Sequence, residues 1–273
     1  MPKKLIGLGF KSRVGKTTIA KAIAEKYGLI HITSDFIKED IEEHRNKGVG
    51  GIFLQVWTHE LSVGNVILKF DDNEWREVMA LVDGIRERNP SAVTIIGTTG
   101  IYIPLLPEDK GFLQLWGTQY RRKLDKDFWV KKMMEKYENS TNGAIIDTVR
   151  FLNEFKAIKE RNGVVALVKR VDSEGNEIEI PVSDRHSQHV SEKELEGVTF
   201  DKIIYNYEGN LEKTLEEVFA WIDSLWPDET SETPNNSKTL DETLEQDSEI
   251  REVVKTSKKR SKDKKQEEQE SIW

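Results

Sequence analysis

The chain has 273 residues, enough for one large domain or two small ones, with a formal net charge of −8 at pH 7 and no cysteine. These values exclude disulfides, thiolate metal sites and cysteine nucleophiles, and they argue against bulk binding of nucleic acid. No apolar run approaches the roughly 20 residues of a membrane span, and the apolar run after Met1–Lys4 is too short for a signal peptide, so we expect a cytoplasmic protein.

Residues 5–20 predict a strand, a phosphate-binding loop and a helix in direct succession. An apolar run reaches Gly9, and Gly15-Lys16-Thr17-Thr18 opens a segment with apolar residues at helical spacing. In such a loop Lys16 reaches the β and γ oxygens of a nucleotide, and the Thr17 hydroxyl holds Mg²⁺. The main chain that cradles the phosphates would be that of Ser12, Arg13, Val14, Gly15 and Lys16, with Thr17 and Thr18 at the helix start.

The spacing of this loop differs from the usual pattern by one residue. Five residues separate Gly9 from Gly15, where the pattern has four. We expect Phe10 or Lys11 to bulge outward, so that residues 15–17 keep the usual geometry. The alternative is a glycine-bearing turn before a helix with a surface lysine, which requires neither the preceding strand nor the Lys-Thr-Thr run.

The next segment predicts a second strand and a helix with a carboxylate at their junction. Residues 29–33 form the strand, and Ser34-Asp35 begins a helix that continues towards Arg45. Asp35 has two interpretations. It could support Mg²⁺-bound water or an acceptor group beside the phosphate loop, or it could simply cap the helix.

Residues 46–107 are less clear. Residues 46–72 give no consistent pattern, 74–88 predict an amphipathic helix, and 92–96 predict a strand. We expect 97–107 to be extended and irregular, because Pro104 and Pro107 interrupt it.

Residues 112–137 predict a helical hairpin that carries candidate ligand contacts. Arg121, Arg122 and Trp129 could bind a phosphate and stack on a base. The alternative is a solvated charged face with a tryptophan in the core.

The second half of the chain predicts three more strands. The strand 143–147 ends on Asp147, where P-loop enzymes place a second metal-supporting group, and a helix follows to about residue 161. Strands at 164–168 and 200–205, a hairpin at 171–182 and a helix at 210–226 complete the folded part. His186 and His189 lack an evident third metal ligand.

Residues 227–273 have a different composition from the rest. They are highly charged and carry no periodic apolar face, so we expect a disordered tail after a domain that covers residues 1–226.

Four motifs in the same order resemble the bacteriophage deoxynucleoside monophosphate kinase family. The first is the phosphate loop, although Thr17 stands where many members of that family carry Asp. The second motif of this chain consists of Leu113-Gln114, Gly117-Thr118, Arg122 and Asp125-Lys126-Asp127-Phe128-Trp129, and it is similar to a pattern of that family. The third is similar to Asp147-Thr148-Val149-Arg150-Phe151-Leu152-Asn153-Glu154, with one extra residue, and the fourth to His189-Val190-Ser191-Glu192, Phe200-Asp201 and Asn206.

The resemblance implies a three-layer α/β P-loop kinase fold. This fold would have a mostly parallel sheet with helices on both faces and a helical substrate-binding excursion at about 46–138. The implied activity is transfer of the γ-phosphoryl group of ATP to a deoxynucleoside 5′-monophosphate, with Mg²⁺ as cofactor. Lys16 would contact the β and γ phosphates, and Asp35 or Asp147 would hold metal-bound water. Arg13, Arg122 and Arg150 would share the acceptor phosphate and the migrating group, and Trp129 would stack on the acceptor base or shape its pocket.

Other functions fit parts of the same pattern. A kinase for another small molecule or for a polynucleotide would keep the phosphate loop and change the acceptor. A regulatory or packaging ATPase would hydrolyse ATP without an acceptor, and an interaction protein would act through its tail. The resemblance implies neither a membrane partner nor sequence-specific nucleic acid. It does not determine the preferred base or the oligomeric state, for which a homodimer is one possibility.

Overall fold

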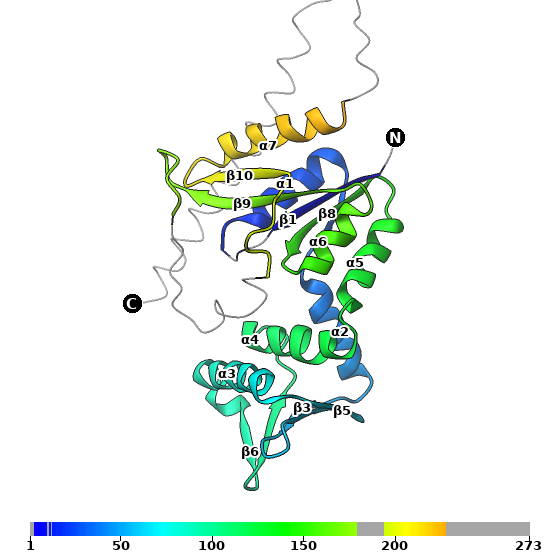
Figure 1. Cartoon of the computed structure of the whole chain (residues 1–273), viewed down its shortest axis with the longest axis vertical. Coiled ribbons are helices and arrows are strands. Elements are labelled where there is room, and N and C mark those ends of the chain that lie inside the picture. The colour runs from blue at the N-terminus through cyan, green and yellow to red at the C-terminus, as the bar shows by residue number, and fades with distance from the viewer. Residues whose placement is uncertain (1–2, 10, 12, 179–193, 228–273) are drawn as a thin grey trace, which may run out of the picture. The chain divides into compact units, whose positions relative to one another are not determined.

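A five-stranded parallel sheet lies at the centre of the computed structural model (Figure 1). Its order is β10-β9-β1-β8-β2, and every neighbouring pair is parallel. The strands are β1 (Lys4–Gly9), β2 (Ile30–Ile32), β8 (Gly143–Val149), β9 (Val164–Val171) and β10 (Lys202–Tyr207). The inner strands β1 and β8 are buried along most of their length, which is typical of a parallel sheet with both faces covered.

Helices cover this sheet on both faces. Helix α1 (Lys16–Tyr27) packs beside α7 (Leu211–Leu225), and α5 (Phe128–Glu138) packs beside α6 (Leu152–Lys159). The two pairs lie on opposite faces (Figure 1). The α/β class and the parallel sheet expected from the sequence are therefore confirmed. The observed strands differ from the predicted ones by a few residues at most, and β9 continues to Val171.

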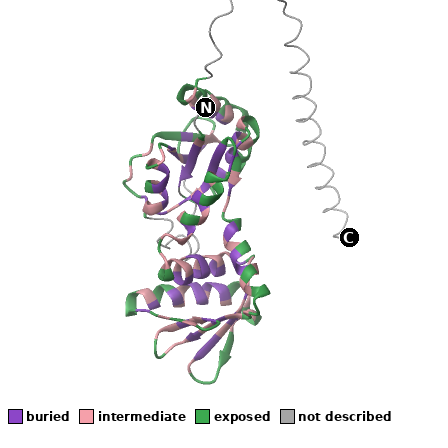
Figure 2. Ribbon diagram, turned by 90° about the vertical axis from the view of Figure 1, so that its right-hand side faces the viewer, coloured by how far each residue is buried: buried purple, intermediate pink, exposed green. Residues whose placement is uncertain are grey.

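Residues 51–104 hold a second sheet, so the excursion expected to be helical is helical only in part. This sheet is antiparallel, with the order β5-β4-β3-β7-β6. Its strands are β3 (Gly51–Gln55), β4 (Glu60–Val63), β5 (Val66–Lys69), β6 (Thr94–Ile96) and β7 (Gly100–Pro104). The segment 97–107, expected to be irregular, contributes β7. Strands β3, β4 and β7 alternate between buried and less buried residues, and Figure 2 shows helices over the buried face.

The helical part of the excursion begins with α3 (Asp72–Arg88) and continues from residue 110. It consists of α4 (Lys110–Gln114), a π-helical segment η2 (Leu115–Arg122) and then α5, while η1 (Pro90–Ala92) is a short 3₁₀ turn. Two buried carboxylates tie these helices to their neighbours. Asp109 accepts hydrogen bonds from Arg88 Nε and Nη2, both at 2.9 Å, and Asp40 is bound by Arg121.

The environment of Asp109 favours its charged form. Burial alone would raise the pKa of this carboxyl, but the hydrogen bonds from Arg88 and from the main chain at Phe112 together hold the pKa below its usual value. Asp109 therefore stays ionised at neutral pH and caps α4, the helix that leads into η2.

The structure describes residues 3–9, 11, 13–178 and 194–227. Met1–Leu225 form one compact unit, and Trp226–Trp273 form a second unit, of which only the first two residues are described. The predicted disordered tail, the pair His186 and His189, and the motif 189–192 all lie outside the described residues. Within the described part, no helix has both the length and the apolar character that crossing a membrane would demand.

Candidate functional site

Three neighbouring strands of the parallel sheet end at one edge, and the chemistry-bearing residues follow them. Strand β1 leads into the loop 10–15, β8 ends with Asp147 and its neighbours, and β2 leads to Asp35. Since β1, β8 and β2 are adjacent and parallel, their carboxyl ends meet. Open parallel sheets bind ligands at this edge.

A cavity of about 550 Å³ lies at this edge, and we call it the phosphate pocket. Four cationic side chains and two carboxylates line it, so its formal charge is positive in a chain whose net charge is −8. The cations are Arg13, Lys16, Lys21 and Arg150, the carboxylates are Asp35 and Asp147, and the hydroxyl-bearing residues are Thr17, Thr18, Thr33, Ser34 and Thr148. Such a lining favours an anion.

The start of α1 has no negative charge of its own. Its first turn is Lys16-Thr17-Thr18, with no acidic residue, and Gly15 at the N-cap provides no side-chain cap. The first N–H groups of a helix have no partner within the helix, and the helix dipole is positive at this end. An external anion is therefore the natural complement of this helix end.

The loop before α1 turns sharply at two positions. Arg13 has φ 63° and Gly15 has φ 91°, a region that L-residues seldom adopt. Asn206 on β10 supports the turn, because its Nδ2 donates to the main-chain oxygen of Val14 at 2.9 Å. Lys16 is 7% exposed, and its Nζ donates to the main-chain oxygen of Lys11 across the loop. Phe10 and Ser12 lie outside the described residues, and Lys11 is exposed.

Asp147 is buried with one oxygen in contact and one without a partner. His31 Nε2 lies 3.1 Å from Asp147 Oδ2, whereas Oδ1 is buried and has no hydrogen-bond partner among residues 3–9, 11, 13–178 and 194–227. The hydroxyl of Thr148 is also buried and also has no hydrogen-bond partner among the described residues. Buried polar groups normally have partners, so these two oxygens suit a ligand that enters the pocket.

The oxygen ligands that line this pocket are suited to Mg²⁺, which needs few protein ligands, and less suited to a metal that only protein side chains coordinate. In the described ranges, no group of three or more His, Cys, Asp or Glu residues is arranged to hold a metal. Mg²⁺, however, usually takes one or two protein oxygens and completes its shell with water and substrate phosphates. Thr17 and the unpartnered oxygen of Asp147 line the same cavity and meet that requirement.

Asp35 is not the cap of α2 (Asp35–Asn46), so the simple capping interpretation is wrong. Ser34 occupies the N-cap position and makes no side-chain cap, while Asp35 is the first helical residue. The Thr33 hydroxyl donates to Asp35 Oδ2 at 2.7 Å, and the side chain of Asp35 lines the phosphate pocket.

A second pocket adjoins the first and is mainly apolar. It has a volume of about 140 Å³, and it shares Ser34, Thr148 and Arg150 with the phosphate pocket. Its other lining residues include Phe36, Ile37, Gly117, Thr118, Arg122, Trp129, Phe151 and Glu154. A charged cavity thus opens beside an apolar one, with Arg150 belonging to both.

Two predicted contacts of the second pocket have specific partners. Arg122 pairs with the buried Glu154 and lies 3.7 Å from the centre of the Phe151 ring. Trp129 is 2% exposed, donates from Nε1 to the main-chain oxygen of Gly117 at 2.9 Å, and packs on Phe36. Trp129 therefore forms a wall of the pocket, and Arg122 is held in place by a carboxylate.

The structure brings most of the sequence candidates together. Arg13 and Arg150 share the phosphate pocket, whereas Arg122 lines the second pocket. The main chain of Val14 is held by Asn206 but does not line either pocket. Sequence reasoning did not place Lys21, His31, Ser34 or Glu154 in the site, although Ser34 was expected at the start of a helix and Glu154 at the end of a motif. The helical spacing that brings Lys21 onto the Thr17 and Thr18 side of α1 could have indicated Lys21, but no local signal marks His31.

We expect Gly15→Ala to lower stability by more than its backbone conformation alone requires. A Cβ on Gly15 would lie 2.2 Å from Asn206 Nδ2, so the residue has to adopt a positive φ and also displace a hydrogen-bonded side chain. These terms together cost about 2–3 kcal/mol of unfolding free energy. Urea unfolding measures the change.

Gly175→Ala is the matched control for this variant. Gly175 has φ 93°, but its Cβ would meet nothing within 4 Å, so only the backbone cost of about 1–2 kcal/mol applies. In an Asn206→Ala background, Gly15→Ala should also cost no more than this control. An equal loss for Gly15→Ala and Gly175→Ala in the wild-type background would contradict the close packing of Asn206 on the loop.

Comparisons with known proteins give little further information. No protein-family model matches the chain, and no curated protein matches it. One similar solved structure is the unliganded crystal structure of a sugar kinase from Janibacter sp. HTCC2649. It is 15% identical with a TM-score of 0.32, and the alignment covers 81% of this chain and 95% of that chain.

Proposed function

We propose that this chain is a P-loop kinase that transfers the γ-phosphoryl group of ATP to a deoxynucleoside 5′-monophosphate. The observation that carries the proposal is the junction of the two pockets at Ser34, Thr148 and Arg150. A cationic cavity at a helix N-terminus suits the phosphates of a donor, and an apolar cavity next to it suits a base. The phosphate that has to be exchanged would then lie at Arg150.

On the donor side, the proposal assigns the phosphates to α1 and its loop. Lys16 contacts the β and γ phosphates, and the main chain up to Gly15 surrounds them. Phosphoryl transfer passes through a loose transition state with charge spread over the oxygens of the migrating group. Fixed cations around that group therefore lower the barrier more than they strengthen ground-state binding. Arg13 and Lys21 add to this positive surface.

A magnesium ion, when bound, would neutralise phosphate charge and help to align the donor with the acceptor. Thr17 would hold it directly, and Asp147, with one buried oxygen in need of a partner, would hold its water. His31 Nε2 lies 3.1 Å from the other oxygen of this carboxylate, Oδ2, although no hydrogen bond joins them. Asp35 faces the same cavity and is the alternative support.

On the acceptor side, Arg150 receives the acceptor phosphate, and the walls from α2 and α5 receive the base. Glu154 offsets the charge of Arg122 and also accepts from the main-chain N–H of Arg150 at 2.8 Å. The carboxylate of Glu154 thus holds both the side chain of Arg122 and the main chain at Arg150, directly after β8. In this arrangement Arg122 acts mainly by shaping the pocket with Phe151, and Trp129 closes it.

A coupled assay of ADP release tests the proposal. With ATP and Mg²⁺, ADP formation should depend on at least one of dTMP, dGMP, dCMP, dAMP or a modified pyrimidine monophosphate. Arg150→Ala should lower kcat/KM for that acceptor by about 10²-fold, since it removes a cation from the migrating group. Arg170→Ala is the matched control, because Arg170 pairs with Glu208 and does not line either pocket.

The same assay separates the alternatives. ADP formation that no monophosphate changes would indicate an ATPase. Activity only with another alcohol or phosphate acceptor would indicate a different kinase. Either result would refute the proposal that the acceptor is a deoxynucleoside monophosphate.

A further inference from the structure

A third pocket lies where the end of α2 meets the antiparallel sheet and η2, away from the phosphate pocket. It has a volume of about 560 Å³ and shares no lining residue with either pocket described above. Its walls come from the end of α2, the glycine-rich segment 48–51, the turn between β4 and β5, and η2. His44 on α2 is nine residues from Asp35, which corresponds to about 14 Å along the helix.

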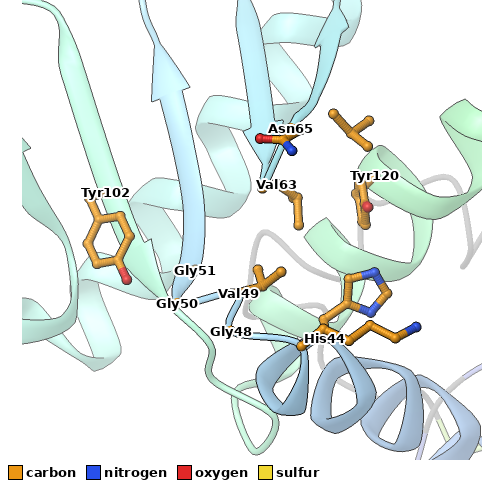
Figure 3. Close-up of a pocket in the computed structure, with 12 residues that line it drawn as sticks. His44, Gly48, Val49, Gly50, Gly51, Val63, Asn65, Tyr102 and Tyr120 are labelled. Carbon is orange, nitrogen blue, oxygen red and sulfur yellow. The ribbon is translucent and has the colours of Figure 1, made fainter.

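Figure 3 shows how the side chains surround this pocket. His44 and Tyr120 lie to one side of the segment 48–51, together with Val63 and Asn65, and Tyr102 lies beyond it. His44 is fixed by the main-chain oxygen of Asp40, 2.8 Å from Nδ1, and its ring packs edge-on against Trp116. His44 and Tyr120 are therefore held by packed helical elements, whereas Asn65 lies on the exposed turn between β4 and β5.

Tyr120 on η2 provides a hydroxyl donor at the wall of this pocket. The residue is 2% exposed, yet no hydrogen bond joins its hydroxyl to any group in the described part of the chain. Burial raises the pKa of Tyr120, so the hydroxyl stays protonated and able to donate. The Tyr120 hydroxyl is not one of the buried polar atoms that lack a partner, so it reaches the cavity, where a ligand or water can accept its hydrogen bond.

The remaining lining selects the kind of ligand. No carboxylate lines the pocket, and the valines at 49, 63 and 66 provide apolar surface. The Asn65 amide has both a donor and an acceptor, as the edge of a nucleobase does, and His44 and Tyr120 add further polar contacts. Lys47 stands at the rim, where it pairs with Glu43.

We propose that this pocket is a second binding site, for the nucleobase of a nucleoside or nucleotide, with Asn65 and Tyr120 as its principal polar contacts. The proposal rests on the lining of this pocket and does not depend on the proposed kinase activity. Whether the natural ligand carries a phosphate decides only whether Lys47 takes part.

Calorimetric titration of the full chain tests this site. The probes are deoxyadenosine, deoxyguanosine, deoxycytidine and thymidine, and then their 5′-monophosphates. At least one probe should bind, and Asn65→Trp, which fills the pocket from an exposed turn, should remove that binding event. Tyr120→Phe should weaken it about three- to tenfold, because only one hydrogen bond is lost. Tyr205→Phe on β10 is the matched control and should change nothing.

The outcomes are distinct from those of the kinase assay. A monophosphate that binds more tightly than its nucleoside, with the difference removed by Lys47→Ala, would identify a nucleotide site, and equal binding would identify a nucleoside site. If no probe binds, or if Asn65→Trp and Tyr120→Phe both bind like the wild type, the proposal is overturned. Circular dichroism of each variant shows whether it is folded. If Asn65→Trp does not fold, binding to Tyr120→Phe still decides the test.

Discussion

Lys16→Ala should lower kcat/KM for phosphoryl transfer from ATP by about 10²–10³-fold, while the protein remains folded. Lys16 is the cation at the start of α1 that the proposed mechanism places on the β and γ phosphates. Removing one preorganised donor from a developing charge costs about 3–4 kcal/mol of transition-state stabilisation. Steady-state kinetics with ATP and the best acceptor measure the loss.

The effect on stability should be much smaller than the effect on rate. In the structure, Lys16 Nζ donates to the main-chain oxygen of Lys11, and losing such a bond at a pocket open to water costs about 1 kcal/mol. Lys38→Ala is the matched control, because Lys38 lies on the exposed side of α2 and pairs with Glu108. Activity of Lys16→Ala close to that of the wild type would refute the assignment of the donor site.

The parallel sheet and the edge that carries the candidate site could be predicted from the sequence because their signals are local. Each strand is a short apolar run, and Gly15-Lys16-Thr17 and Asp147 mark the ends of two of them. Adjacent parallel strands bring their carboxyl ends together, so two local signals suffice to predict one pocket. The order of β1 and β8 in the sheet agrees with this prediction.

The antiparallel sheet could not be predicted in the same way, because its pairing is not local. Strand β3 pairs with β7, and Gly51 faces Pro104 across 53 residues of sequence. Strands of three to five residues carry little periodic signal, and their stability depends on contacts with a distant partner. The proline that indicated an irregular segment is tolerated because it lies at the end of β7.

The roles of side chains were the least predictable part of the site. Arg122 pairs with Glu154, and this pairing depends on how η2 and α6 pack, which no motif records. The expected contact of Arg122 with a phosphate stays a prediction. Likewise, Ser34 and Asp35 are both good capping residues, and only the backbone shows that the helix begins at Asp35. A motif identifies the residue types that meet at a site, whereas packing decides what each of them contacts.

Asp40→Ala should lower the free energy of unfolding by about 3–5 kcal/mol, the largest effect on stability that we expect from a single substitution outside the apolar core. Asp40 is 2% exposed and accepts from Arg121 Nε at 2.7 Å and from Arg121 Nη2 at 2.6 Å. The indole of Trp116 donates to the same carboxylate at 2.8 Å. Alanine would leave a mostly buried guanidinium and an indole N–H without their acceptor. Urea unfolding should show a lower midpoint with an unchanged slope.

A double variant distinguishes a buried charge from a lost contact as the cause. If the cost of Asp40→Ala comes from the uncompensated charge of Arg121, then adding Arg121→Met should restore part of the stability, since replacing both partners is far less costly than replacing one. Asp125→Ala is the control, because its exposed pair with Lys131 should contribute little. Arg121 lies between Tyr120 of the third pocket and Arg122 of the second, and Asp40 lies on the helix that begins at Asp35. The ion pair therefore joins α2, which contributes residues to all three pockets, to η2, which contributes to the second and third. A double variant that regains stability but does not bind the ligands proposed for these pockets would show that the pair also sets the register of the two elements.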